Sequence, residues 1–241
     1  MKIFTNMQEG FNSLFSKYKQ QVYQNTNIWV GEDNRPKVDI LLIGGGSASG
    51  TTTLANTLVK KINREFQETC PTGVAGVIGL DNYYKDRDES FLHTPDHLIN
   101  HDHPEMIDVE LLARHLLQLK SGARVEMPVY NFGDNDRPGY RESNLSLEFE
   151  PYPLIMVEGL FALDDRLQKL ASDKVFVYSD EEISKQRRIN RDKKERGKSK
   201  DLSIKKWYHS VLPMYKEHVF PRIVDSDYLI FNNEELSEDF F

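Results

Sequence analysis

The amino-acid sequence predicts an α/β fold organised around a phosphate-binding loop, with a parallel sheet and helices on both faces. Residues 38–43, V-D-I-L-L-I, form a short run rich in branched apolar side chains, which is typical of a buried parallel strand. Three glycines follow at 44–46, and an apolar stripe at Leu54, Leu58 and Ile62 then predicts a helix. A strand, a glycine-rich turn and a helix together place backbone N–H groups and a helix N-terminus around phosphate.

The turn fits the P-loop pattern except at one position. Gly45, Gly50 and Thr52 have the required spacing, but Thr51 stands where the motif has lysine. The change removes a positive charge and leaves the backbone N–H groups of the loop in place. The residues that we expect to bind the nucleotide phosphates are Gly45, Gly46, Ser47, Ala48, Ser49, Gly50, Thr51, Thr52 and Thr53.

The composition indicates one sizeable domain and narrows the class of protein. The chain has 241 residues, enough for a single α/β core, and its net charge of −7 argues against a surface that binds nucleic acid as a whole. A single cysteine, Cys70, permits no internal disulfide and favours a cytoplasmic location. No apolar run approaches about 18 residues, so we expect no membrane-spanning segment.

Two further strands are predicted to end in carboxylates. Residues 74–80 form a short apolar run that ends at Asp81, and residues 154–157 form another that ends at Glu158. Ligands of parallel sheets lie beyond the carboxyl ends of the strands, so both side chains should lie near the P-loop. Oxygen ligands at that place suit a Mg²⁺–nucleotide site. Asp81 is a candidate general base or metal-side ligand; alternatively, it only caps a helix.

The remaining segments set the expected domain organisation. Residues 1–37 are interpreted as an amphipathic N-terminal helix followed by a linker. That helix either packs on the domain or binds a membrane surface or a partner helix. Residues 38–233 form the main domain, with a β-hairpin at about 123–150 that could clamp a substrate, and residues 234–241 form an acidic tail.

Residues 185–200 carry nine basic and two acidic side chains in an otherwise acidic chain. Such a run is usually a solvated helix face, but next to a phosphate loop it suits an arginine-rich lid over a triphosphate, which we place at about 185–206. Binding of RNA is less favoured, because no aromatic residues are interleaved with the basic ones.

Four histidines in one polar stretch raise the question of a zinc site. They are His93, His97, His101 and His103. Pro95 and Pro104 interrupt any helix that would align these histidines, and no cysteine lies among them. The sequence therefore gives little support to zinc.

Seven motifs, in order, resemble the uridine kinase family of P-loop kinases, to which phosphoribulokinase is related. The matching stretches are G-G-S-A-S-G at 45–50, L-D-N-Y-Y at 80–84, D-H-P at 102–104, P-V-Y-N-F at 128–132, V-E-G-L at 157–160, R-R-I-N-R-D-K-K-E-R-G at 187–197 and S-D-Y-L-I at 226–230. Each motif alone is weak, but their number and order make the resemblance specific. It implies a P-loop NTPase fold like that of nucleoside kinases, with a hairpin excursion and a helical lid.

The resemblance implies Mg²⁺-dependent transfer of the γ-phosphate of ATP or GTP to the 5′-hydroxyl of uridine or cytidine, a step of pyrimidine salvage. Carried over position by position, Asp81 would accept the proton of that hydroxyl. Thr52, Asp81 and Glu158 would hold the Mg²⁺ ion. The expected partner is thus a small-molecule nucleoside.

The resemblance also assigns roles to the basic segment and to a substrate pocket. Arg188, Arg191 and Arg196 would neutralise the transferring phosphoryl group. The residues expected around the nucleoside are Tyr84, Asp102, Tyr130, Phe132, Asn135, Arg188, Lys198 and Lys206.

Several positions depart from the family pattern. Thr51 replaces the P-loop lysine, as in some phosphoribulokinases of the bacterial type, and Asn135 stands where uridine kinases usually have a histidine. His101 replaces a common aromatic residue, and Lys198 and Lys206 stand where arginine and glutamine are frequent. Because these changes cluster around the expected substrate, they weaken the assignment of a particular substrate more than the assignment of kinase activity.

Two other functions therefore stay open. One is a catalytically weak nucleotide-binding regulator, which Thr51, Asn135 and His101 would suit. The other is a kinase for a sugar phosphate such as ribulose 5-phosphate, which Thr51 and the basic segment would suit. Relatives often form homotetramers, so the resemblance implies self-association. The N-terminal helix could occupy the place of a C-terminal helix that the family usually has.

Overall fold

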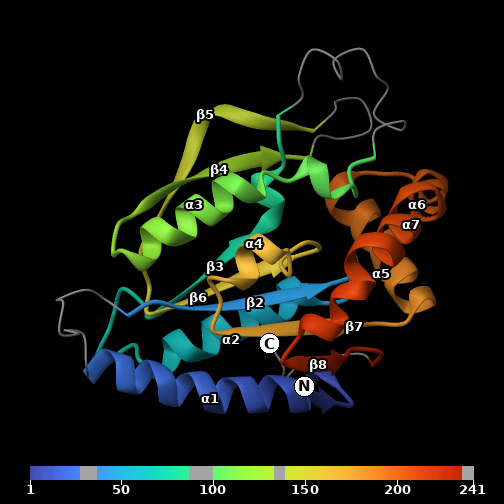
Figure 1. Cartoon of the computed structure of the whole chain (residues 1–241). Helices are drawn as coiled ribbons and strands as arrows, with labels where there is room; N and C mark the ends of the chain where they lie inside the picture. Colours follow the sequence, from blue (N-terminus) through green and yellow to red (C-terminus); the bar gives the residue numbers. More distant parts are fainter. Residues whose placement is uncertain (28–36, 87–99, 133–138, 235–241) are drawn as a thin grey trace.

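A computed structural model describes residues 1–27, 37–86, 100–132 and 139–234. A six-stranded sheet lies at its centre, in the order β1, β8, β7, β2, β6, β3, and neighbouring strands are parallel (Figure 1). The strands are β1 (Lys2–Phe4), β2 (Asp39–Gly45), β3 (Ala75–Gly79), β6 (Leu154–Gly159), β7 (Asp173–Tyr178) and β8 (Tyr228–Phe231). The predicted parallel α/β sheet is confirmed.

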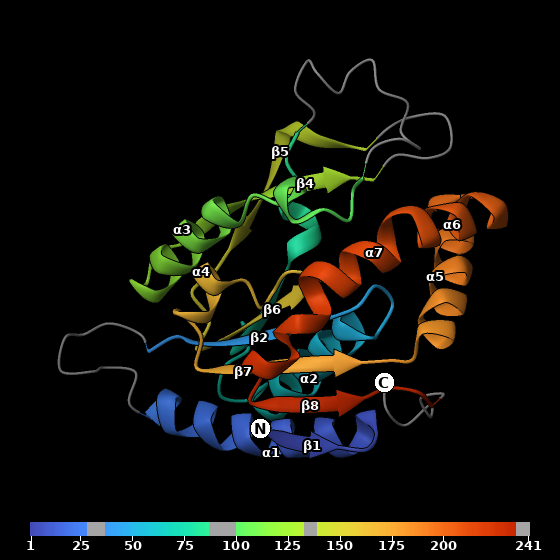
Figure 2. The same ribbon diagram turned by 45° about the vertical axis from the view of Figure 1, so that its right-hand side comes forward.

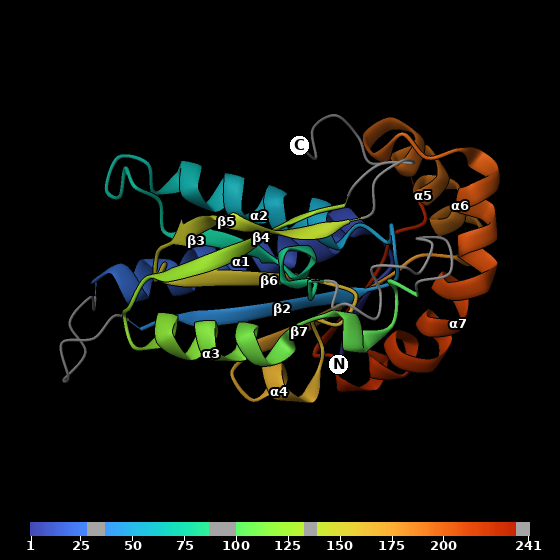
Figure 3. The same ribbon diagram turned by 90° about the horizontal axis from the view of Figure 1, so that it is seen from above.

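Helices cover both faces of this sheet (Figure 3). One face carries α1 (Met7–Asn27) and α2 (Thr51–Glu65), whose buried side chains share one core, and the other carries α3 (Val109–Lys120) and α4 (Asp165–Gln168), whose buried side chains share the opposite core. The side chains of β2 alternate between the two cores: Leu41 and Ile43 join the core under α1 and α2, and Ile40 and Leu42 join the opposite core. A strand buried on both faces needs apolar residues at successive positions, which explains the run at 38–43.

The N-terminal strand and helix complete one side of the sheet. β1 pairs with β8, and α1 contacts both α2 and β8. The sequence pattern does not predict β1, because Lys2, Ile3 and Phe4 are too few to show a period and only Phe4 is partly buried. The buried Tyr18 of α1 donates a hydrogen bond of 2.5 Å to Asp173 at the start of β7. α1 is therefore attached to the sheet and forms part of the domain.

Two further units lie outside the sheet. β4 (Val125–Asn131) and β5 (Tyr140–Phe149) pair as an antiparallel hairpin that contacts the short helix η1 (Leu80–Tyr83). A helical segment joins the end of β7 to the start of β8; its first helices lie beyond the edge where both strands end, and its later turns run back along the sheet (Figure 2). It comprises α5 (Glu181–Arg196), α6 (Lys200–Lys206), η4 (Trp207–Val211), α7 (Leu212–Met214), η5 (Tyr215–Val219) and η6 (Phe220–Asp225). A short helix η3 (Pro104–Met106) precedes α3.

Candidate active site

The P-loop connects β2 to α2 and is shaped by close contacts. Gly50 precedes α2 with a φ of 105°, a left-handed conformation that suits glycine, and a Cβ there would lie 2.4 Å from Nδ2 of Asn232. The same nitrogen donates a hydrogen bond of 2.7 Å to the carbonyl of Ser49. A Cβ on Gly46 would lie 3.0 Å from the ring of Tyr215. Residues after β8 and in η5 thus hold the loop at the edge where the parallel strands end.

A cavity of about 560 Å³, a size suited to small-molecule ligands, opens over this loop. Its walls include Gly46, Ser47, Ala48, Gly50, Thr51, Thr52, Thr53, Asp81, Tyr84, His101, Asp102, Tyr130, Phe132, Glu158, Arg187, Arg188, Arg191, Arg196, Lys198, Lys206, Ser210 and Asn232. Of the residues that the sequence selects, Gly45 and Ser49 belong to the loop without lining the cavity. Asn135 lies outside the described residues. The structure brings the other selected residues together here.

Glu158 ends β6 beside the P-loop and is buried there. In the neighbouring strand β3, Gly79 lies opposite Glu158, and Asp81 follows in η1. Oε2 of Glu158 accepts hydrogen bonds of 3.0 Å from the hydroxyls of Thr51 and Thr52. Burial and the charge of Asp81 raise the pKa of Glu158 to about 7, although the two threonine hydroxyls act in the opposite direction.

The carboxyl of Asp81 faces the cavity, and 55% of its side chain is exposed there. Desolvation by the surrounding protein nevertheless raises its pKa, and the nearby charges of Arg196, Arg191 and Arg188 oppose that increase. Nη2 of Arg196 lies 3.8 Å from Oδ2 of Asp81. A carboxylate with a raised pKa is a stronger proton acceptor than an ordinary one, provided that it is ionised.

The arginines of α5 are partly neutralised by acids inside the protein. Arg188 is buried, and its Nη1 donates to Oγ of Ser47 at 2.7 Å and to Oδ1 of Asp102 at 3.2 Å. Asp192, only 2% exposed, lies 3.5 Å from Arg188 and 3.0 Å from Arg191. The basic segment therefore brings fewer uncompensated charges to the cavity than its composition suggests.

Three aromatic rings form one wall of the cavity. The ring centroids of Tyr84 and Tyr130 lie 5.0 Å apart, and the centroid of Phe132 lies 5.7 and 5.1 Å from them respectively. Arg196 covers this wall, with its guanidinium carbon 4.0 Å from the Phe132 centroid. Clustered rings of this kind give a flat ligand an apolar contact surface.

Three other residues of the site are not selected by the sequence. Ser210 of η4 donates to Oδ2 of Asp102 at 3.0 Å, and Asn232 holds the P-loop. Arg187 donates to the carbonyl oxygens of Asn232 and Glu234, each at 2.8 Å. Only Arg187 carries a signal that could have revealed it, its place in the basic motif; a lone serine or asparagine shows no pattern before the chain is folded.

The two described histidines of the polar stretch, His101 and His103, make ring contacts. His101 lies edge-on to Tyr84, with centroids 6.5 Å apart, and His103 lies 5.5 Å from His218. Within the described ranges, no three histidine, cysteine or acidic side chains gather as a group that could hold a metal ion. His93 and His97 lie outside those ranges. In the same part of the chain, no helix combines the length and apolar character needed to cross a bilayer.

Comparison with known proteins decides the family. The model of the phosphoribulokinase/uridine kinase family matches residues 40–235. The chain belongs to this family. A uridine kinase of Pasteurella multocida (strain Pm70) is 34% identical over 203 residues, which are 83% of this chain and 89% of that protein. A uridine kinase of Staphylococcus aureus (strain JH9) is 34% identical over 193 residues, 79% of this chain and 86% of that one.

Solved structures share the fold at lower identity. Phosphoribulokinase from Rhodobacter spheroides is 18% identical, with a TM-score of 0.59 over 85% of this chain and 74% of that one. A D-glycerate 3-kinase from Cryptococcus neoformans var. grubii is 15% identical, with a TM-score of 0.59 over 88% of each chain. The fold of this chain is thus one that these two kinases share.

Proposed function

We propose that this kinase transfers the γ-phosphoryl group of ATP or GTP to the 5′-hydroxyl of uridine or cytidine, with Mg²⁺. The observation that carries the proposal is the meeting of a P-loop, two carboxylates and an aromatic wall in one cavity. The relatives named uridine kinase, which match most of the chain, support the choice of acceptor.

The acceptor nucleoside would lie against the aromatic wall. Tyr84, Tyr130 and Phe132 offer ring contacts to a pyrimidine base. Asp102, held by Arg188 and Ser210, would accept hydrogen bonds from the ribose hydroxyls, because each of its oxygens has a second lone pair. Lys198 and Lys206 line the same cavity and would contact the nucleoside.

The oxygen ligands beside the P-loop fit Mg²⁺, which prefers hard oxygen donors. Thr52, Asp81 and Glu158 would hold it. Burial and the charge of Asp81 raise the pKa of Glu158 to about 7, and a divalent cation beside it would favour its ionised form, which supports the proposal. The chemistry that Mg²⁺ supplies at such a site is neutralisation of charge on the phosphates.

The protein contributes to the transfer mainly by positioning the reactants and by stabilising charge. As the 5′-oxygen bonds to the γ-phosphorus, the bond from that phosphorus to the β,γ-bridging oxygen breaks, and the nucleoside diphosphate leaves. Asp81 would take the proton of the 5′-hydroxyl. Arg191 and Arg196, on the cavity wall with Arg188, would stabilise the negative charge on the transferring group.

The experiment is a measurement of ADP release with Mg²⁺ and ATP against uridine, cytidine, other nucleosides and ribulose 5-phosphate. We expect turnover with uridine or cytidine, and a fall of about 10²- to 10⁴-fold in kcat for Asp81→Asn. Asp201→Asn, at an exposed position of α6, is the matched control and should keep its activity.

Other outcomes would replace the proposal with a definite alternative. Turnover with ribulose 5-phosphate alone would make the protein a sugar-phosphate kinase. Nucleotide binding without turnover on any acceptor would indicate a regulator that retains the nucleotide site. Repeating the panel with GTP identifies the preferred phosphate donor.

A further inference from the structure

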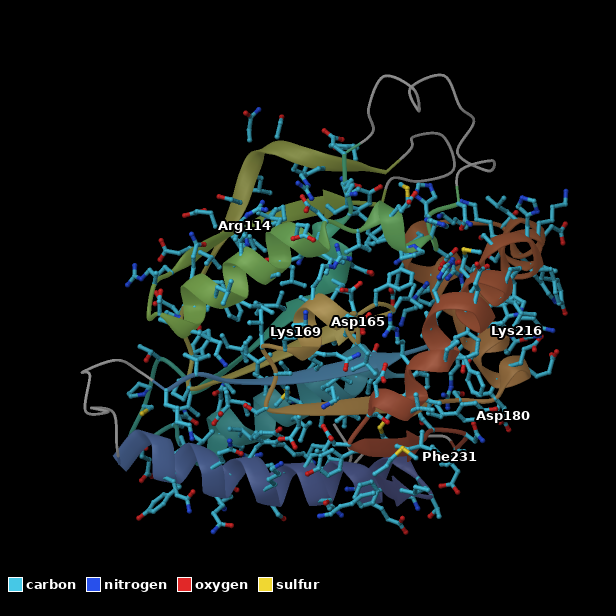
Figure 4. The ribbon with its side chains drawn as sticks, viewed as in Figure 1. Arg114, Asp165, Lys169, Asp180, Lys216 and Phe231 are labelled. Carbon is cyan, nitrogen blue, oxygen red and sulfur yellow. The ribbon has the colours of Figure 1, made fainter. Side chains whose placement is uncertain are left out.

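A second cavity, of about 370 Å³, lies beside the P-loop. In the described part of the chain it shares only Gly46 and Ser47 with the cavity that holds Asp81. Its other walls come from the end of β7, the first turns of α5, and the segment from η4 to η6. Figure 4 shows this region, where Asp180 and Phe231 mark the ends of β7 and β8 and Lys216 lies on the helical segment beside them. Of its described lining, only Gly46 and Ser47 belong to the seven family motifs.

The walls of the second cavity are aromatic and aliphatic. The ring centroids of Tyr215 and Phe220 lie 5.8 Å apart, and that of Tyr178 lies 6.4 Å from Phe220. Trp207 and Leu212 also line this cavity. Such walls favour a flat aromatic ligand, because stacked or edge-to-face rings are stabilised beyond their buried area.

The charged groups of this cavity are already matched to each other. Lys216 and Glu181 are the charged residues among the described lining, and their side chains lie 3.8 Å apart. The cavity over the P-loop is different, since several arginines and lysines line it. A charged ligand would lose hydration in the second cavity without gaining a counter-charge of its own, so an uncharged ligand is favoured.

The helix that walls the cavity is distorted at this place. η4 and η5 are π-helical turns, and α7 between them contains Pro213. Proline has no N–H to donate, so the carbonyl of His209, four residues earlier, cannot be bonded in the ordinary helical way. π-helical turns occur frequently at functional sites because they widen the helix and redirect its side chains.

Two contacts connect this cavity to the P-loop. The ring of Tyr215 packs on Gly46, where an added Cβ would lie only 3.0 Å from it. Ser47 lines both cavities and accepts the 2.7 Å hydrogen bond from Arg188, and Ser184, one helical turn before Arg188, lines the second cavity. A ligand that contacts Tyr215 and Ser184 would therefore touch the ring that packs on Gly46. It would also touch the helical turn before Arg188, whose side chain is hydrogen-bonded to Ser47.

We propose that this cavity binds an uncharged, flat aromatic molecule of one or two rings, and that its occupation changes the affinity of the P-loop for nucleotide. The binding of the aromatic molecule stands independently of the proposed kinase reaction. The change in affinity rests on nucleotide binding at the P-loop, and does not depend on which acceptor is phosphorylated.

Indole, a neutral two-ring molecule, is the probe, and its binding to the full chain is followed by NMR. We expect saturable binding, with intermolecular NOEs from indole to the ring protons of Tyr215 and the methyl groups of Leu212. Leu212→Trp fills the cavity and should weaken indole binding about tenfold or more, the loss of a well-packed ring contact. Val224→Trp, at a position that is 80% exposed, adds the same side chain elsewhere and should leave binding unchanged.

The second measurement is the dissociation constant of ADP with and without saturating indole. We expect a change of about threefold or more, and the reciprocal change in indole affinity when ADP is bound. Absence of saturable indole binding, NOEs to other residues, or equal binding by Leu212→Trp and the parent protein would overturn the site. Unchanged ADP affinity would overturn the coupling. If the protein phosphorylates no acceptor, indole binding is unaffected, so the two failures can be told apart.

Discussion

The hydroxyl of Thr51 donates a hydrogen bond of 3.0 Å to Oε2 of Glu158, at the place where the P-loop motif has lysine. Side chain 51 is thus directed to the carboxylate at the end of β6 and is 9% exposed. The site has exchanged a cation for a neutral donor to a carboxylate whose pKa burial raises to about 7. Phosphate binding then depends on the backbone of the loop and on the arginines of α5.

We expect Thr51→Lys to strengthen ATP binding, by at most about tenfold. The new ammonium group would lie near the phosphates, but also beside Glu158, and pairing with that carboxylate limits its gain. Isothermal titration with ATP and Mg²⁺ measures the effect, and Thr51→Met is the control for length without charge. Equal affinities for the lysine and methionine variants would show that side chain 51 does not reach the phosphates.

Ser210 is expected to position Asp102 for the acceptor. Its Oγ donates to Oδ2 of Asp102 at 3.0 Å in a buried place. Ser210→Ala removes a hydrogen bond of about 1 kcal/mol and should let the carboxylate of Asp102 turn, which should raise KM for the nucleoside about fivefold. ATP affinity should be unchanged. Ser210→Thr keeps the hydroxyl and should restore KM.

Ser203→Ala provides the matched control for this prediction. Ser203 is also a buried serine of the same helical segment, and its Oγ has no hydrogen-bond partner among the described residues. Its loss should leave KM unchanged. A similar rise in KM for both alanine variants would point to a packing effect and would contradict the positioning role of Ser210.

Phe132 is expected to fix Arg196 over the acceptor. The guanidinium carbon of Arg196 lies 4.0 Å from the Phe132 centroid, and its Nη2 lies 3.8 Å from Asp81. Phe132→Leu removes a cation–π contact of about 0.5–2 kcal/mol and should lower kcat/KM for the nucleoside about two- to thirtyfold. Phe132→Tyr keeps an aromatic face and should retain most of the activity. Equal losses in both variants, measured by steady-state kinetics, would refute the ring contact.

The sequence predicts the centre of the sheet and the P-loop because their signals are local. The apolar run at 38–43, the glycine spacing and the carboxylates after two strands each lie within a few consecutive residues. Parallel strands end at one edge, so these segments meet once the sheet is assembled. The sequence also predicts the arginines of the site, because basic residues are concentrated in one segment.

The supporting residues could not be predicted, because only distant parts of the chain define them. Asp192 counts as one acid in a basic segment, yet it lies inside the protein between Arg188 and Arg191. Ser210 gains a role only in the folded chain, where η4 lies beside Asp102 and the serine hydroxyl donates to its carboxylate. β1 has three residues and obtains its hydrogen bonds from β8, more than 220 residues later, so no local pattern marks it.

Tyr18 is expected to stabilise the attachment of α1 to the sheet. Its hydroxyl is buried and donates to Oδ2 of Asp173, which Lys17 also contacts at 2.6 Å. Tyr18→Phe leaves this carboxylate with one donor fewer and should lower the free energy of unfolding by about 1–2 kcal/mol. Tyr23→Phe, on the same helix at a position that is 63% exposed, should change that free energy by less than about 0.5 kcal/mol.

The same tyrosine predicts a pH dependence of stability. Burial, followed by the charge and hydrogen bond of Asp173, raises the pKa of Tyr18 above its ordinary value of 10.0. On unfolding, the phenol regains the lower pKa, so its contribution is fully present below pH 10 and is lost as pH rises through the folded pKa. Denaturant unfolding between pH 9 and 11 should therefore show a steeper loss of stability for the parent than for Tyr18→Phe. Parallel pH profiles for the two proteins would mean that the Tyr18 hydroxyl is not held in the environment that the structure shows.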